Sequence, residues 1–109
     1  MFKREDRLGP FSLKNSKTYS SKLFNVRFAK NDLEKNRFAF VVSKKVDSSA
    51  VARNRIRRRL RAIIEAKSDK MKLGFDFIFY PKAVIQDLAK EDLEMEIESF
   101  LEKQTFLKQ

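Results

Sequence analysis

One uninterrupted stretch, residues 50–67, constrains the fold of this 109-residue chain more than any other. It lacks Gly and Pro and is rich in Ala, Arg, Leu and Ile, and the preceding Asp47-Ser48-Ser49 offers N-cap residues, so we predict a helix. At about 100° per residue, one side of this helix is apolar. That side consists of Ala52, Ile56, Leu60 and Ile63. The rest of the chain must therefore supply a layer that covers it.

The other side of the same helix is strongly basic. Residues 53–61 contain six arginines and no acidic residue, and Asn54, Arg57, Arg58 and Arg61 cluster opposite the apolar stripe. Like charges three or four residues apart repel by a few tenths of a kcal/mol per pair, and an ordinary solvated helix would intersperse Glu. The missing acids indicate that phosphate groups supply the counter-charge, and Arg rather than Lys favours bidentate phosphate binding and stacking on bases.

Two other interpretations of the basic helix compete with nucleic-acid binding. It can be a merely solvated face, or an amphipathic helix for a membrane surface or a calmodulin-type partner. Both are less favoured, because so small a domain needs the apolar side for its own core. Structured RNA is the natural match, although the helix alone leaves sequence-specific DNA open.

The remaining pattern predicts an α+β domain. Alternation in residues 23–28 and an apolar run in residues 38–43 predict two strands, which we expect to pair as an antiparallel hairpin. Residues 75–80 predict a third strand, and residues 90–103 a second amphipathic helix. Residues 1–22 are interpreted as a basic arm with at most a short helix, and residues 23–103 as the core of one domain spanning residues 1–109.

Composition narrows the chemistry. The formal net charge is +10, and residues 83–109 alone are acidic, with three basic and seven acidic side chains. The chain has no Cys and no His, which removes disulfides, thiolate or imidazole metal ligands and the usual general base. No apolar run approaches the roughly 20 residues of a membrane span. We therefore expect a cytoplasmic polyanion-binding protein with no membrane partner and no small-molecule substrate.

A family resemblance rests on three segments in a fixed order. Val42-Ser43-Lys44-Lys45-Val46 is followed by Ala50-Val51-Ala52 and the Arg-Asn-Arg helix of residues 53–61, and then by the strand of residues 75–78 and Pro81. In this respect the chain resembles the protein subunit of bacterial ribonuclease P over about residues 22–101. The resemblance implies a single-domain α/β sandwich like the second domain of ribosomal protein S5. Its sheet would be mixed, with helices on one face and a left-handed strand–helix–strand crossover.

The resemblance also implies two sets of RNA contacts. The catalytic RNA would contact Lys44, Lys45, Arg55, Arg58 and Arg61. The 5′ leader of precursor transfer RNA would contact Phe11, Leu13, Phe24, Val26, Arg53, Asn54 and Arg57, with Phe28 assigned to the core. Aromatic faces can stack on single-stranded bases with little sequence preference.

The activity implied by the resemblance belongs to a ribonucleoprotein. The RNA subunit would hydrolyse one phosphodiester bond and release the leader, with Mg²⁺ bound mainly by RNA, and the protein would supply no catalytic residue and no metal ligand. The alternative is a non-catalytic RNA-binding or ribosome-associated protein of the same fold. A protein-only nuclease is disfavoured, because few acids converge near the basic helix.

Overall fold

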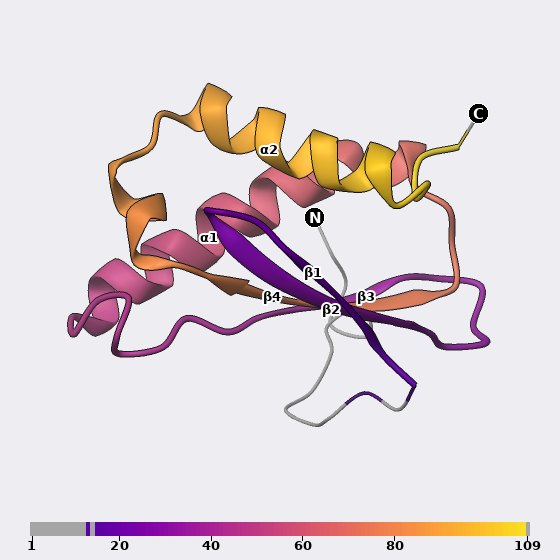
Figure 1. The fold of residues 1–109 in the computed structure, drawn as a ribbon, viewed down its shortest axis with the longest axis horizontal. Helices are drawn as coiled ribbons and strands as arrows, with labels where there is room; N and C mark the ends of the chain where they lie inside the picture. Colours follow the sequence, from indigo (N-terminus) through magenta and orange to yellow (C-terminus); the bar gives the residue numbers. More distant parts are fainter. Residues whose placement is uncertain (1–12, 14, 109) are drawn as a thin grey trace.

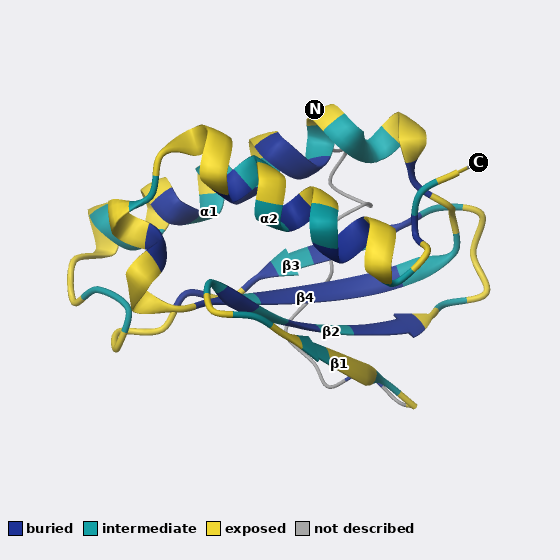
Figure 2. Cartoon of the chain, turned by 45° about the horizontal axis from the view of Figure 1, so that its top comes forward, coloured by how far each residue is buried: buried dark blue, intermediate teal, exposed yellow. Residues whose placement is uncertain are grey.

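The computed structural model describes residue 13 and residues 15–108. In the described part, a four-stranded sheet is covered on one face by two helices that lie side by side (Figures 1 and 2). The elements in chain order are β1 (Lys17–Ser20), β2 (Phe24–Lys30), β3 (Arg37–Phe40), α1 (Ala50–Lys67), the 3₁₀ turn η2 (Ser68–Lys70), β4 (Phe75–Pro81), the 3₁₀ turn η3 (Ala83–Asp87) and α2 (Lys90–Lys103). The predicted α+β class and the predicted bounds of both helices are confirmed.

Helix α1 begins where its cap residues predict. The Ser49 hydroxyl accepts a hydrogen bond from the Ala52 backbone N–H at 3.3 Å, and the Ser49 N–H donates to Asp47 Oδ1 at 2.8 Å. The predicted apolar side is the side that packs on the sheet. Its buried residues are Ile56, Leu60, Ile63 and Ile64.

The sheet is mixed, with the strand order β1-β2-β4-β3. Strand β4 pairs antiparallel with β2 and parallel with β3, so α1 forms the crossover between two parallel strands. The predicted hairpin of residues 23–28 with residues 38–43 is therefore wrong, because β4 lies between these strands. The reason is burial: almost the whole of β4 is buried on both faces, which suits the centre of the sheet rather than an edge.

The N-terminal arm contains a strand that the sequence pattern did not predict. Strand β1 lies at the sheet edge and pairs antiparallel with β2, and its Tyr19 ring lies 4.9 Å from the Phe100 ring between centroids. Part of the expected basic arm or short helix is thus a strand, whereas residues 1–12 lie outside the described residues. The core also extends past residue 103, because Phe106 is buried and Lys72 N–H donates to the Phe106 carbonyl at 2.7 Å.

Aromatic rings fill the space between the sheet and the helices. Phe100 of α2 is fully buried and lies within 6.5 Å, between ring centroids, of Tyr19 and five other Phe rings. These five rings belong to Phe24, Phe28, Phe77, Phe79 and Phe106. Edge-to-face arrangements dominate, as ring quadrupoles favour. Phe28 is confirmed as a core residue.

An ion pair between partly exposed Arg37 and buried Asp76 fixes β3 to β4. Arg37 donates two hydrogen bonds to the Asp76 carboxylate, from Nε at 2.8 Å and from Nη2 at 2.7 Å, and Asn31 Nδ2 donates a third at 2.9 Å. The hydrogen bond to Asp76 raises the pKa of Arg37, despite an opposing effect of burial, so its guanidinium stays charged. Asp76 is 4% exposed, so these three donors take the place of the water that would otherwise solvate its carboxylate.

Asp76→Ala should lower the free energy of unfolding by about 2 kcal/mol, because Arg37 and Asn31 lose their shared acceptor. The expected loss in the free energy of unfolding is moderate because the Arg37 side chain is 31% exposed, so water can replace part of the lost contact. Urea unfolding followed by circular dichroism measures the change. An unfolding midpoint equal to that of the unmodified protein would show that the pair contributes nothing.

Candidate RNA interface on helix α1

Three arginines of α1, Arg53, Arg57 and Arg59, donate hydrogen bonds to neutral groups. Arg53 Nη1 donates to the carbonyls of Asp47 and Ser48 at 2.9 Å each, and Arg59 Nη2 donates to the Leu88 carbonyl at 2.9 Å. Arg57 donates to the Asn54 side-chain oxygen. None of these acceptors carries a charge, so the contacts orient the guanidinium groups without neutralising them.

One shallow groove brings together residues from both predicted RNA-binding sets. It has a volume of about 310 Å³ and is lined by Val51, Asn54, Arg57, Arg58 and Arg61, and we call it the outer groove. Arg61 also lies over the Phe40 ring, 5.2 Å from its centroid. The geometry does not divide these residues into one surface for catalytic RNA and another for substrate, because Arg61 shares the groove with Asn54 and Arg57.

A second groove lies between α1 and the start of α2, and we call it the interhelix groove. It has a volume of about 400 Å³ and is lined by Arg55, Arg58, Arg59, Ala62, Ile63 and Lys90. Arg55 and Arg58 were predicted as RNA contacts, whereas Arg59 and Lys90 were not. Lys90 precedes an acidic helix, and no local pattern in the sequence indicates that it lies next to α1.

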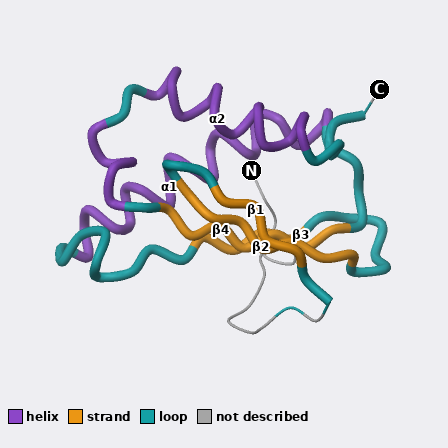
Figure 3. Tube along the Cα trace, in the orientation of Figure 1, coloured by secondary structure: helices purple, strands orange, loops and turns teal. Residues whose placement is uncertain are grey.

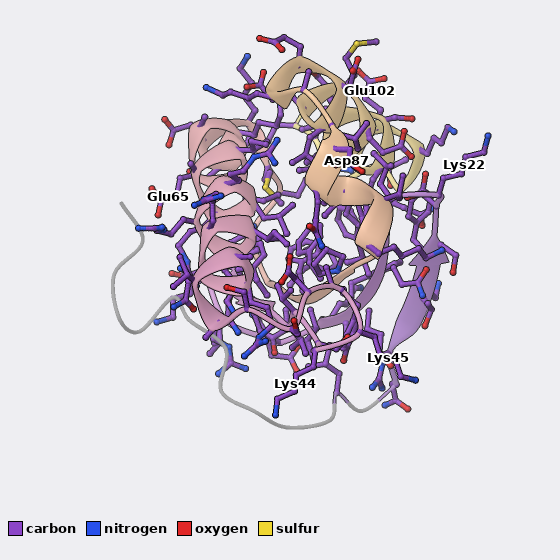
Figure 4. The ribbon with its side chains drawn as sticks, turned by 90° about the vertical axis from the view of Figure 1, so that its left-hand side faces the viewer. Lys22, Lys44, Lys45, Glu65, Asp87 and Glu102 are labelled. Atoms are coloured by element: carbon purple, nitrogen blue, oxygen red, sulfur yellow. The ribbon has the colours of Figure 1, made fainter. Side chains whose placement is uncertain are left out.

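Two further predicted contacts lie in the loop before α1. Lys44 and Lys45 are exposed in a turn of residues 41–49, which joins β3 to α1 at one end of the molecule (Figure 3). Both side chains point outward from this loop, away from Asp87 and Glu102 (Figure 4). The position extends the positive surface of α1 beyond its N-terminus.

The predicted strand contacts to the leader need a correction. Phe24 and Val26 are 0% exposed and pack under the helices in the main core, so they have no surface to offer RNA. Side chains alternate along a strand, so their neighbours Asn25 and Arg27 belong to the other face of the sheet. The alternation of residues 24–28 correctly indicates one apolar side of the strand, but that side packs against the helices and not against RNA.

The sheet face turned away from the helices carries a smaller cluster. We call it the distal face, and its described residues include Asn25, Arg27, Ala29, Ala39, Ile78 and Tyr80. Leu13 is buried against it, beside Ala29 and Ile78, whereas Phe11 lies outside the described residues. Arg27 Nη2 donates to Ser16 Oγ at 2.9 Å, which ties the start of the described chain to β2.

Charge is segregated within the helix layer. Helix α2 carries six acidic residues and two lysines, and its described ion pairs use Lys67 with Glu98 at 3.4 Å and Lys90 with Glu94 at 3.7 Å. The acids of α2 therefore do not reach the predicted RNA contacts of α1 in the described ion pairs. A polyanion would meet α1 favourably and α2 unfavourably.

The described residues were also compared with the patterns typical of metal sites and of membrane-spanning helices, and they fit neither. They contain no group of three or more His, Cys, Asp or Glu side chains placed to hold a metal ion. Nor does any helix in this part of the chain have the length and apolar character needed to cross a membrane.

The fold and the arginine helix agree with comparisons to known proteins. A family model described as Ribonuclease P matches residues 11–105. The chain belongs to the ribonuclease P protein family. The ribonuclease P protein component of Syntrophomonas wolfei is 32% identical over 87 residues, covering 80% of this chain and 72% of the relative. That of Clostridium botulinum strain Loch Maree is 34% identical over 91 residues, covering 83% and 81%.

Solved structures of ribonuclease P proteins share the fold. The protein from Thermotoga maritima superimposes with a TM-score of 0.76 at 23% identity, over 83% of this chain and 84% of that one. A Staphylococcus aureus ribonuclease P protein gives a TM-score of 0.78 at 21% identity, over 94% and 98%. Membership of the family makes this chain a component of a transfer-RNA-processing ribonucleoprotein, which implies an RNA partner.

Proposed function

We propose that this protein binds the catalytic RNA of ribonuclease P through α1 and assists that RNA in removing the 5′ leader from precursor transfer RNA. The observation that carries the proposal is that Arg53, Arg57 and Arg59 of α1 donate to neutral acceptors, so these contacts leave their positive charge uncompensated. RNA phosphates are the counter-charge that this surface fits, and neutralising them lowers the repulsion between enzyme RNA and substrate RNA.

The cleavage itself is assigned to the RNA subunit. We also propose that the cleavage uses Mg²⁺ and that the RNA holds this ion. The contribution of the protein is to position two RNAs, and no residue of the chain has to touch the scissile phosphate.

Reconstitution tests the proposal directly. The full chain, mixed with a bacterial ribonuclease P RNA, should restore cleavage of precursor transfer RNA at a low magnesium concentration at which the RNA alone is inactive. Neither the protein alone nor the protein with a catalytically inactive RNA should cleave. Binding of the RNA without restored cleavage would favour the alternative, a non-catalytic RNA-binding or ribosome-associated protein.

The distal face is the proposed place for the leader, instead of Phe24 and Val26. Its half-buried Tyr80 lies opposite Asn25 in the β2–β4 register, and a tyrosine ring on a sheet can stack on a base of any sequence. Leu13 lies on the same face, and Arg53, Asn54 and Arg57 on α1 remain proposed leader contacts.

Tyr80→Ala should weaken binding of precursor transfer RNA to the reconstituted complex about five- to tenfold, since one base loses its stacking surface. Binding of mature transfer RNA should stay unchanged, and Tyr80→Phe should retain the affinity for both. Equal losses for precursor and mature RNA would rule out a leader-specific contact at Tyr80.

A further inference from the structure

We infer that the interhelix groove is a nucleotide-binding site for the catalytic RNA, separate from the outer groove. The phosphate would lie between Arg55, Arg58 and Lys90, and the base or ribose would rest on Ala62 and Ile63. The inference depends on the proposed function, and it adds a contact from α2, a helix that is otherwise acidic.

The groove is built from two elements that are fixed to each other. Arg59 donates its hydrogen bond to the Leu88 carbonyl, two residues before α2 begins, so the start of α2 is held against the middle of α1. Ile63 is buried and Ala62 is exposed, which gives the groove an apolar floor between its cations. Its volume of about 400 Å³ falls within the range of small-ligand pockets, about 300–1,000 Å³.

The cations around this floor are available to an anion. Arg55 and Arg58 are exposed, and neither forms an ion pair within residue 13 and residues 15–108. The Lys90 side chain is 70% exposed, and its contact with Glu94 at 3.7 Å is a surface pair of small energy. No acidic residue is among the described residues that line the groove. A phosphate would gain charge-assisted hydrogen bonds from two sides.

The position of the groove favours catalytic RNA over the leader. Arg58 borders both the interhelix groove and the outer groove, so one RNA backbone crossing α1 can reach both. The distal face, where the leader is proposed to bind, lies on the other side of the sheet from the helices (Figure 2). A leader that runs from that face to its proposed contacts on α1 would reach the outer groove, whereas the interhelix groove lies on the side of α1 next to Lys90 of α2.

Lys90→Ala measures the contribution of α2. The dissociation constant for the catalytic RNA should rise about fivefold, and the slope of log affinity against log salt should become shallower by about one, because one phosphate contact is lost. Lys103→Ala removes the same charge from the other end of α2 and should change neither quantity. Equal effects of both substitutions would mean that only net charge matters, which would overturn the inference.

A cross-link locates the RNA independently of affinity. The chain has no Cys, so Ala62→Cys provides a single thiol for a photoreactive reagent at the floor of the groove. In the reconstituted complex it should cross-link to one short segment of catalytic RNA, whereas Met95→Cys, at a 70% exposed position of α2, should not.

Three outcomes separate this inference from the proposed function. If Ala62→Cys gives no RNA cross-link and Lys90→Ala binds normally while loss of Arg58 and Arg61 weakens binding, the groove is not a site but the proposed function stands. Should loss of Arg58 and Arg61 have no effect either, both proposals fail. A cross-link to precursor transfer RNA or to another protein overturns the assignment to catalytic RNA.

Discussion

Simultaneous replacement of Arg58 and Arg61 with Ala should weaken binding of the catalytic RNA about 10- to 100-fold at about 0.1 M salt. Both residues line the outer groove, and Arg58 borders the interhelix groove as well. Each lost phosphate contact should also reduce the slope of log affinity against log salt by about one, giving a total change of about two. Equilibrium binding across a series of salt concentrations measures both quantities.

Two controls make this result specific. Arg58→Lys with Arg61→Lys keeps the charge, so the salt slope should be retained while part of the affinity is lost with the bidentate geometry. Lys103→Ala with Lys108→Ala removes two charges from the C-terminal segment and should have little effect. Unchanged affinity and slope in the double Ala variant, with a normal circular dichroism spectrum, would show that α1 is not the RNA-binding surface.

Phe100→Ala should lower the free energy of unfolding by about 3–5 kcal/mol, which is a large part of the stability of a small domain. Phe100 is fully buried and links β1, the central strands and the C-terminal segment through its ring contacts. Its removal leaves a cavity that neighbouring rings cannot fill without leaving their rotamers. The midpoint and slope of urea unfolding give the change.

Met95→Ala is the matched control for Phe100→Ala. It removes a large apolar side chain from the same helix at a position that is 70% exposed, so the stability should change by no more than about 0.5 kcal/mol. A loss for Phe100→Ala as small as that of Met95→Ala would contradict the central role of the Phe100 ring. RNA binding by the Phe100→Ala variant would not contradict this role, because bound RNA stabilises any form that is folded.

The helices could be predicted because their signals are local. Residues 50–67 have a cap, no Gly or Pro and a continuous apolar stripe. Residues 90–103 have no side-chain cap, but they also lack Gly and Pro and have an apolar stripe, with acids on the exposed side. Strand pairing could not be predicted in the same way, because alternation shows which residues share a face but not which strand lies beside another. For this reason the sequence did not predict that β4, the most deeply buried strand, lies between β2 and β3, which are neighbours in the sequence. Strand β1, four residues long with one half-buried ring, gives almost no pattern.

In the candidate site, too, residues grouped by a local pattern could be predicted, whereas residues brought together by tertiary contacts could not. The arginines on the exposed side of α1 follow from helical periodicity, so their grouping could be predicted. Arg59 and Lys90 meet only through the tertiary contact at Leu88, which no spacing in the sequence indicates. Phe24 and Val26 were misassigned because an apolar strand face equally suits a core and a stacking surface, and only the location of the helices decides between them.

The opposite charges of α1 and α2 give the molecule a permanent electric dipole across its helix layer. In the field of an RNA, such a dipole exerts a torque that turns the protein during its approach, before any side chain touches the target. Encounters therefore begin with α1 leading and α2 trailing, so a larger share of collisions is productive than for a protein of equal but evenly spread charge. Added salt would screen this orienting field over a shorter distance. We therefore expect salt to lower the association rate more than it raises the dissociation rate.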